Sequence, residues 1–193
     1  MEFTDPDSAI FTHNETHPSR LKAASRCKIL MSKHHIDFNN GTAKPISRHS
    51  GNQYAKREFA GIKMMNGYIY INHKGIKCYL HQLVFYAYHG FLPEFIDHAD
   101  RDRSNNSISN LRPATINENN RNMGMNRRNK SGFKGVHFDR SRSKFVANIT
   151  VNNKGIFLGR FNSAEEAHNA YADAAKKHFG QFAFAARADK NDK

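Results

Sequence analysis

The sequence predicts a mixed α+β protein built from two small units, and three observations favour this class. A strand, a polar loop, a second strand and a helix follow one another within residues 80–122. Residues 131–187 show three strand patterns followed by one amphipathic helix, and a basic segment at 123–130 separates the two regions. A chain of 193 residues has room for one domain or two small ones, and 15 Phe with no Trp favour two modest cores.

The composition indicates a nucleic-acid partner. Lys and Arg number 30 against 17 Asp and Glu, which gives a net charge of +13, and the natural partner of such a surplus is a polyanion. Two cysteines are too few for a disulfide framework, and the polar start of the chain lacks the apolar core of a signal peptide. No apolar run approaches the roughly 20 residues of a membrane helix. We therefore expect a soluble, cytoplasmic protein with no membrane partner.

Residues 1–26 carry little hydrophobic periodicity, so we expect a flexible N-terminal tail. The first folded unit is predicted to span residues 27–122. Its beginning, up to Met65, has short apolar pieces between turn signals and is interpreted as an irregular, partly stranded lead-in. The histidines at 34, 35 and 49 lack partners at metal-ligand spacing and are expected to be exposed.

A hairpin and a short helix are predicted next. Two β-prone runs, 68–71 and 76–79, flank a short turn containing Gly75. Apolar residues then recur at intervals of three and four, which predicts a helix over 81–89 that ends at Gly90. Cys78 and His81 have the spacing of half a zinc site, but a full site needs four ligands, so zinc is not favoured.

The passage from Ile96 to Asn122 carries the chemistry. Asp97 and His98 stand where a strand ends, the loop from 100 to 107 is entirely polar, and Thr115 with Glu118 forms a capping box that begins a helix. Asn119 falls in the first turn of that helix. A hairpin followed by a helix can bring Asp97 and Asn119 to opposite sides of one cavity beside His98, which suits one divalent ion near a base.

This segment resembles the HNH endonuclease motif, the ββα-metal finger, in the version of phage and homing-type nucleases that has Asn at the third position. The resemblance spans about Leu80 to Asn122 and rests on Asp-His, Asn-Asn, Ser-Asn-Leu-Arg and Glu-Asn at these spacings. It implies a ββα-metal nuclease that hydrolyses phosphodiester bonds in double-stranded DNA with one Mg²⁺ or Mn²⁺ per site and takes no small-molecule substrate. A phage-encoded enzyme would act in the host cytoplasm.

The resemblance also implies residue roles. Asp97 and Asn119 would bind the metal and His98 would be the general base. Asn110 is the middle Asn, which braces the loop and helps to orient the histidine, with Asn105 or Asn106 as the alternative. At the helix before the motif, His81 would contact DNA. The Arg frequent after it in the family is replaced by Gln82, which has no charge for a phosphate.

The second unit, predicted at 131–187, has strand patterns at 133–138, 144–151 and 155–161. A capping box at Ser163 and Glu166 begins a helix that Gly180 ends. Three antiparallel strands with one helix behind them leave the other sheet face free, and that face carries Lys134, His137, Lys144, Asn148 and Thr150. Residues 188–193 are expected to be a tail.

This unit resembles the AP2 DNA-binding domain over about 131–186, through Phe-Lys-Gly-Val at 133, Leu-Gly-Arg-Phe at 158 and Glu-Glu-Ala at 165. The resemblance implies a three-stranded antiparallel sheet packed on one helix that reads the major groove. The family's first-strand arginines correspond to Lys134 and His137, and its sheet tryptophans to Phe145 and Phe157. Other groove-reading charges are replaced by Asn148, Thr150 and Gly155, so sequence readout of the plant type is not expected.

Basic residues of both units are the predicted DNA contacts. From 121 to 144 the chain has eight Lys or Arg and one acidic residue. Besides His81, the predicted DNA-binding residues are Arg101, Arg103, Arg112, Arg127, Arg128, Lys130, Lys134, His137, Arg140 and Lys144. Two alternatives stay open: a DNA-binding regulator with a purely structural HNH finger, and an RNA binder. The sequence leaves the target site, nicking or double-strand cleavage, a homing role and the oligomeric state open.

Overall fold

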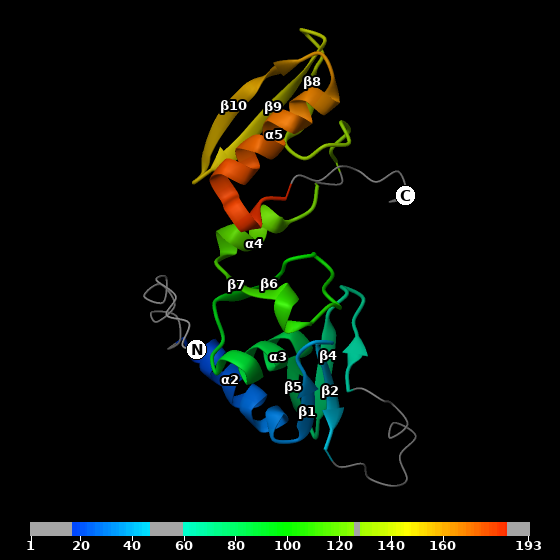
Figure 1. Ribbon diagram of the computed structural model, residues 1–193, viewed down its shortest axis with the longest axis vertical. Helices are drawn as coiled ribbons and strands as arrows, with labels where there is room; N and C mark the ends of the chain where they lie inside the picture. Colours follow the sequence, from blue (N-terminus) through cyan, green and yellow to red (C-terminus); the bar gives the residue numbers. More distant parts are fainter. Residues whose placement is uncertain (1–16, 47–59, 126–127, 185–193) are drawn as a thin grey trace. The chain divides into compact units, whose positions relative to one another are not determined.

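The computed structural model describes residues 17–46, 60–125 and 128–184 (Figure 1). The chain divides into two compact units, Met1–Ile116 and Asn117–Lys193. Helices and antiparallel strands occur in both units, so the predicted α+β class is confirmed. The predictions for Arg127, for His49, for the first 16 residues and for the C-terminal tail lie outside the described residues.

The first unit begins with helix α2, Pro18–Met31. Pro18 suits the first helical position because it has no N–H to leave unsatisfied. The side chain of His17 accepts a hydrogen bond from the backbone N–H of Ser19, which caps the helix. Cys27 and Leu30 are buried. The expectation of a flexible tail up to residue 26 is therefore wrong from Pro18 onward.

Two small sheets follow. Strands β1 (His34–Asp37) and β2 (Thr42–Pro45) form a hairpin, and β3 (Ile62–Lys63), β4 (Ile69–His73) and β5 (Ile76–Tyr79) form an antiparallel sheet in the order β3-β4-β5. The predicted hairpin of β4 and β5 is confirmed. Helix α3, Leu80–His89, is confirmed as well, and Gly90 ends it in the left-handed conformation, with φ of 83°.

The core of the first unit lies between α2, α3 and these strands. Helix α3 contributes Leu83, Val84 and Phe85, which are fully buried. Cys27 of α2 and Cys78 of β5 contact each other through their thiols, and this hydrogen bond together with burial raises the pKa of Cys27. This apolar core therefore supports the hairpin that follows next in the chain.

That hairpin consists of β6 (Phe95–His98) and β7 (Leu111–Ala114), which pair antiparallel with Asp97 opposite Arg112. A short 3-10 helix, η3 (Ile108–Asn110), leads into β7. Helix α4, Ile116–Asn122, follows directly. The predicted succession of strand, polar loop, strand and helix is confirmed.

The second unit contains a three-stranded antiparallel sheet of β8 (Val136–Asp139), β9 (Lys144–Val151) and β10 (Lys154–Phe161), in the order β10-β9-β8. Helix α5, Ala164–Phe179, packs on one face of this sheet, and η4 (Gly180–Phe182) follows it. The side-chain oxygen of Ser163 accepts from the N–H of Glu166 at 3.1 Å, as the capping box predicts, but Glu166 accepts from the N–H of Asn162.

Small apolar side chains let α5 lie close to the sheet. Ala167, Tyr171 and Ala175 are buried against Ala147 and Ile149 of β9. Alternation along β9 places Asn148 and Thr150 on the other face, together with Phe157 of β10, which pairs with Asn148. Phe157 is 55% exposed, and the guanidinium carbon of Arg160 lies 5.0 Å from the centre of its ring.

Helix α4 is grouped with the second unit except for its first residue, Ile116, so the division falls at the start of α4 and not at the predicted linker 123–130. The ammonium group of Lys134 donates to the carbonyl oxygens of Arg121 and Met123, both at 2.7 Å. The guanidinium carbon of Arg121 also lies 4.8 Å from the centre of the Phe179 ring. These interactions attach the end of α4 to the sheet unit. None of the described helices is long and apolar enough to cross a membrane.

Candidate active site in the β6–β7 hairpin

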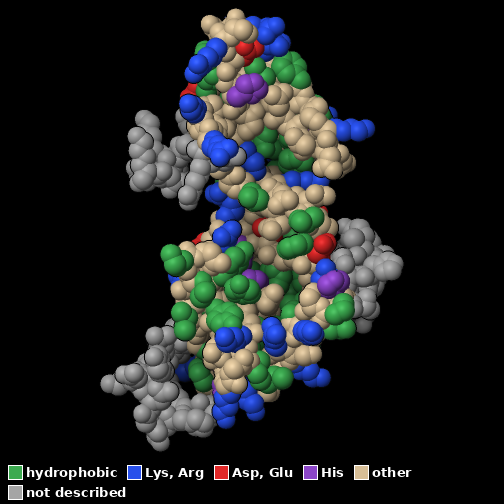
Figure 2. Space-filling view, turned by 180° about the vertical axis from the view of Figure 1, so that it is seen from behind, with side chains coloured by type: hydrophobic (Ala, Val, Ile, Leu, Met, Phe, Trp, Pro, Cys, Tyr) green, Lys and Arg blue, Asp and Glu red, His purple; other side chains and the backbone are tan. Residues whose placement is uncertain are grey.

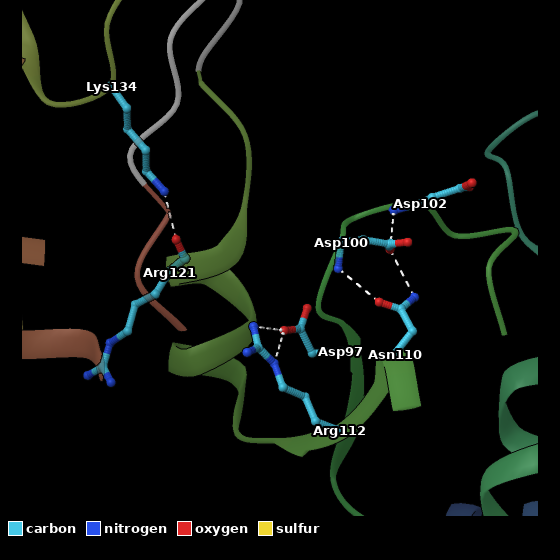
Figure 3. A network of polar contacts seen from close by, with 7 residues as sticks. All are labelled: Asp97, Asp100, Asp102, Asn110, Arg112, Arg121 and Lys134. Atoms are coloured by element: carbon cyan, nitrogen blue, oxygen red, sulfur yellow. Dashed lines mark hydrogen bonds and ion pairs between the residues drawn. The ribbon is translucent and has the colours of Figure 1, made fainter. Parts of the chain in front are cut away.

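A buried ion pair joins the two strands of the hairpin. Asp97 is 4% exposed, and Arg112 donates to its Oδ2 from Nε at 2.8 Å and from a terminal nitrogen at 2.6 Å (Figure 3). The two residues are directly opposite in the register, which places their side chains on the same face. A buried carboxylate needs such a partner, because an unpaired charge is costly to remove from water. The phosphate contact predicted for Arg112 is thus replaced, in this structure, by a contact to Asp97.

His98 is buried beside this pair and is oriented by an amide. It is 4% exposed, and its Nε2 lies 3.2 Å from Oδ1 of Asn106. The Asn106 amide is itself oriented, because its Nδ2 donates to the carbonyl oxygen of Ser104 at 3.0 Å. Since an amide oxygen can only accept, Nε2 of the neutral ring carries the hydrogen and Nδ1 carries the basic lone pair.

The pKa of His98 is lowered, mainly because burial disfavours the charged imidazolium. The hydrogen bond with Asn106 and the carboxylates of Asp100, Asp97 and Asp102 oppose this shift. A lowered pKa keeps the ring neutral near pH 7, which is the form that can accept a proton.

Asn110 ties the polar loop together. Its Oδ1 accepts from the backbone N–H of Asp100 at 2.9 Å, and its Nδ2 donates to Oδ1 of Asp100 at 2.9 Å and to the carbonyl oxygen of Asn105 at 2.8 Å (Figure 3). Asn110 thus holds the loop, whereas the amide bonded to Nε2 of His98 is that of Asn106, one of the two alternatives considered for this role.

The turn of the β1–β2 hairpin contacts the polar loop that contains Asn106. Oδ1 of Asp37 accepts from the N–H groups of Asn39 and Asn40, both at 3.0 Å, and these bonds lower the pKa of Asp37. The carbonyl oxygen of Phe38 accepts from the N–H of Ile108 at 2.8 Å. Gly41 ends the turn with φ of +60° and lies directly against the backbone of Asn106. Sequence reasoning assigned this turn no function.

Replacing Gly41 with alanine is expected to destabilise the protein by about 3 kcal/mol, because it combines backbone strain with steric overlap. An added methyl group would lie 1.9 Å from the carbonyl carbon of Asn106. Gly75→Ala is a matched control, since Gly75 also has a positive φ, +84°, but has nothing within 4 Å. We expect the control to cost about 1 kcal/mol. Equal losses in urea denaturation would contradict the contact with Asn106.

Aromatic rings surround the histidine. The ring of Tyr68 lies 5.9 Å from that of His98 and 5.2 Å from that of His81, and Tyr79 stacks on His81 at 5.4 Å. The ring of His81 lies 5.3 Å from His98 in an edge-to-face arrangement. The two tyrosines were not predicted as part of the site, because the β-prone run that contains Tyr68 indicates only a strand.

His81 lacks the exposure and the positive charge expected of a residue that contacts a phosphate. It is 9% exposed, and burial followed by the charge of His98 lowers its pKa to about 3. Among the described residues, its Nδ1 has no hydrogen-bond partner. A neutral, buried ring does not offer a phosphate a positive charge, so a DNA contact by His81 would have to be a hydrogen bond from a neutral imidazole.

The low pKa of His81 has a consequence for acid stability. The unfolded side chain, with a pKa of about 6.5, binds a proton as the pH falls, while the folded one stays neutral down to about pH 3. The unfolded state thus binds more protons, and stability decreases by about 1.4 kcal/mol per pH unit below 6.5. We expect His81→Gln to flatten this slope between pH 7 and 5 in urea denaturation, and His35→Gln, at an exposed strand position, to leave it unchanged.

The second predicted metal ligand, Asn119, lies in α4. It belongs to the unit that begins at Asn117, whereas Asp97 belongs to the preceding one. Within the described ranges, no group of three or more His, Cys, Asp or Glu side chains is arranged to hold a metal ion. A site of the predicted kind would need only one such residue, because its other protein ligand is an amide.

Several predicted DNA-binding residues make contacts with other residues of the protein. Arg103 donates to the carbonyl oxygen of Asn66 at 3.0 Å, and its guanidinium carbon lies 4.9 Å from the centre of the Tyr68 ring. Lys144 donates to the side-chain oxygen of Asn162. Lys134 bonds to the end of α4, as described above. Arg101 is exposed and adopts φ of 67°, a conformation that is costly for residues other than glycine.

Four other predicted DNA-binding residues share one surface of the second unit. An open cavity of about 610 Å³ is lined by residues between 128 and 140 and by Phe145 of β9, and it includes Phe138, which is 48% exposed. The predicted DNA-binding residues at this cavity are Arg128, Lys130, His137 and Arg140. Figure 2 shows Lys and Arg side chains over the visible face of both units and few acidic ones.

A comparison with protein family models finds a match in the region of the β6–β7 hairpin. Residues 78–121 match the family model of an HNH endonuclease, a range that includes Asp97, His98, Asn110 and Asn119. No curated protein and no solved structure matches the chain. The match supports a nuclease domain of the HNH class, whose substrate is DNA and whose members generally depend on a divalent metal.

Proposed function

We propose that this protein is a divalent-metal-dependent endonuclease that hydrolyses phosphodiester bonds in double-stranded DNA, of the type found in phage and homing nucleases. The observation that carries the proposal is the buried pair of Asp97 and His98 at the end of β6, in the segment that matches the HNH endonuclease model. Both side chains are held by other residues, Asp97 by Arg112 and His98 by Asn106. Such restraint is expected for catalytic groups.

The donor set fits a hard cation. Asp97 offers a carboxylate and Asn119 an amide oxygen, and oxygen ligands of this kind suit Mg²⁺ or Mn²⁺. We propose these two residues as the protein ligands of one ion. When bound, the ion would supply a positive charge for the phosphate and for the departing 3′ oxygen.

His98 is the proposed general base. Its Nε2–H is directed to Asn106, so Nδ1 is the atom that takes a proton from the attacking water. Burial keeps the ring neutral before the reaction. Asn110 is proposed to keep the loop that contains Asn106 in place, through its bonds to Asp100 and Asn105.

Arg112 is proposed to position Asp97. Its two hydrogen bonds converge on one carboxylate oxygen, which fixes the carboxylate and compensates its charge. Arg101 is proposed to bind a phosphate of the DNA. Arg101 is exposed and has a backbone conformation that is costly for residues other than glycine. A glycine at this position would relieve the strain but would remove the charge.

The second unit is proposed to bind the DNA, as its resemblance to the AP2 domain implies. The cavity that Arg128, Lys130, His137 and Arg140 share supports this role, because clustered cations displace the counterions of DNA. The helix-free face of the sheet, with exposed Phe157 beneath Arg160, is also available to the duplex.

Neutralising this cavity is expected to weaken DNA binding and its salt dependence. Removing one cation that binds a phosphate lowers the slope of log K against log salt by about 1, so a triple variant of Arg128, Lys130 and Arg140 to Gln should lower it by up to about 3. The measurement is fluorescence anisotropy of a labelled duplex at several salt concentrations. A control with the exposed α5 residues Lys176 and Lys177 changed to Gln is expected to retain most of the slope.

The proposed function is tested by incubating the protein with supercoiled plasmid and Mg²⁺ or Mn²⁺. Conversion to open-circular or linear DNA that stops when a chelator is added supports the nuclease. The product form distinguishes nicking from double-strand cleavage. A DNA-binding regulator would bind the plasmid and leave it supercoiled.

A further inference from the structure

A second cavity of the C-terminal unit shares no lining residue with the basic one. It measures about 590 Å³, within the usual range of about 300–1,000 Å³ for ligand sites. Helix α4, strand β9, the β9–β10 turn and helix α5 all contribute to its wall. The lining residues are Asn117, Asn120, Arg121, Lys134, Gly135, Asn148, Ile149, Thr150, Asn152, Asn153, Tyr171 and Phe179.

Five asparagines contribute to this wall. Asn117 and Asn120 come from α4, Asn148 from β9, and Asn152 and Asn153 from the turn. Within the described part of the chain, none of these five amides makes a side-chain hydrogen bond to another residue. The amides of the β6–β7 loop differ, because Asn105, Asn106 and Asn110 all bond within the protein. The cavity is therefore lined by asparagines whose side-chain amides folding does not use.

The charge of the cavity is positive. No Asp or Glu lines it, and Arg121 has no carboxylate partner among the described residues. The Arg121 guanidinium lies 4.8 Å from the centre of the Phe179 ring, and the backbone carbonyl of Arg121 accepts from Lys134 (Figure 3). A guanidinium at this wall can donate to a phosphate group.

A tyrosine hydroxyl adds a third group. Tyr171 is 5% exposed and lines the cavity, and its side chain has no hydrogen bond to any residue that the structure describes. Its ring is fixed against Gly135, where an added methyl group would lie 2.1 Å from a ring carbon. Burial also raises the pKa of Tyr171, so the hydroxyl stays protonated and can donate. A tyrosine hydroxyl without a protein partner at the wall of a cavity is available to a ligand that can accept its hydrogen.

We propose that this cavity binds one unpaired nucleotide of a DNA strand, with the base among the amides and the Tyr171 hydroxyl and a flanking phosphate on Arg121. Side-chain amides match the mixed donors and acceptors of a base edge, and an unpaired nucleotide is the form in which that edge is accessible. A phosphate alone would leave the amides unused. The cavity concerns DNA binding by the second unit and does not depend on the cleavage reaction. It would select sites at which the duplex opens easily.

The test compares binding to a labelled perfect duplex and to the same duplex with one extra, unpaired adenine, in the presence of a chelator so that cleavage plays no part. We expect wild-type protein to bind the bulged duplex about tenfold tighter, since base-edge contacts contribute about 1–3 kcal/mol of discrimination. In the Asn120→Ala and Tyr171→Phe variants, the ratio of the affinity for the bulged duplex to that for the perfect duplex should fall toward 1. The affinity for the perfect duplex should stay unchanged. Asn169→Ala, an exposed Asn of α5 that does not line the cavity, is the matched control and should keep the preference.

Competition identifies the ligand. Deoxyadenosine monophosphate is expected to abolish the preference for the bulged duplex at concentrations at which inorganic phosphate does not. Equal competition by both would show an anion site and overturn the nucleotide assignment. An equal preference in wild type and both variants would overturn it as well. Tyr171→Phe keeps the ring that packs on Gly135, and its thermal unfolding midpoint checks that a lost preference does not reflect unfolding.

Discussion

Replacing His98 with alanine is expected to reduce the rate of DNA cleavage by about 10³-fold, the range over which general bases contribute to catalysis. The variant loses the imidazole whose Nδ1 takes the proton of the attacking water. The reduction should appear in the single-turnover rate on a saturating DNA substrate. DNA affinity measured with a chelator present should stay within about twofold, because the residues proposed to bind DNA lie elsewhere.

Two controls make this result specific. His35→Ala changes an exposed histidine of β1 and is expected to cleave at the wild-type rate. Asn106→Ala leaves the histidine but removes its acceptor, so we expect a smaller loss, about tenfold to a hundredfold. Wild-type rates in both His98→Ala and Asn106→Ala would contradict the assignment of the base.

Asp97→Asn is expected to reduce metal-dependent cleavage strongly and to destabilise the protein. The amide has nearly the same shape but lacks the charge, so the proposed ion loses its anionic ligand and the rate falls by at least about 10²-fold. Arg112 then faces a neutral group in a buried setting, and we expect a loss of about 2 kcal/mol in the free energy of unfolding.

Calorimetric titration with Mn²⁺ separates the two effects. Wild-type protein is expected to show one binding event that Asp97→Asn lacks, at a temperature where both are folded. Asp173→Asn, an exposed carboxylate of α5, is the control and should bind Mn²⁺ like the wild type. If Asp97→Asn is destabilised but still binds Mn²⁺ and cleaves DNA, the carboxylate has only the structural role of pairing with Arg112.

The parts of the fold that sequence predicts well are those whose local pattern and burial agree. Helix α3 has apolar residues at intervals of three and four and ends at Gly90, and all of these features recur in the structure. Helix α2 was missed because its apolar residues do not form a clear stripe. Leu21, Ile29 and Met31 are exposed, while Cys27 and Leu30 carry its packing. Tertiary packing, not a local pattern, stabilises that helix.

The candidate site shows a similar limit. Spacing alone places Asp97 and His98 together at a strand end. Spacing does not show which amide orients the histidine. Asn105, Asn106 and Asn110 all lie in or next to the polar loop, and residues distant in the sequence determine the path of that loop. The close approach of Gly41, which lies far away in the chain, is part of what places Asn106.

Charged residues were the least predictable. Arg112 is predicted to contact DNA because it is basic, and Lys134 and His81 because they match DNA-contacting positions of the families that the two units resemble. In the structure Arg112 pairs with Asp97, Lys134 bonds to two carbonyl oxygens, and His81 is buried and neutral. A sequence gives the type of charge but not its partner, and the partner determines whether the charge is available to a ligand.

Asp97 and His98 are proposed to support metal-dependent cleavage of duplex DNA. The most direct test is to incubate the protein with a pooled library of random duplex sequences and Mg²⁺ or Mn²⁺ and to sequence the new strand ends, which also detects a stringent target site. We predict new ends at defined sequences that are absent with a chelator and in His98→Ala. If no ends form with either metal while the wild-type protein binds the same library, the nuclease proposal is wrong and a DNA-binding regulator takes its place.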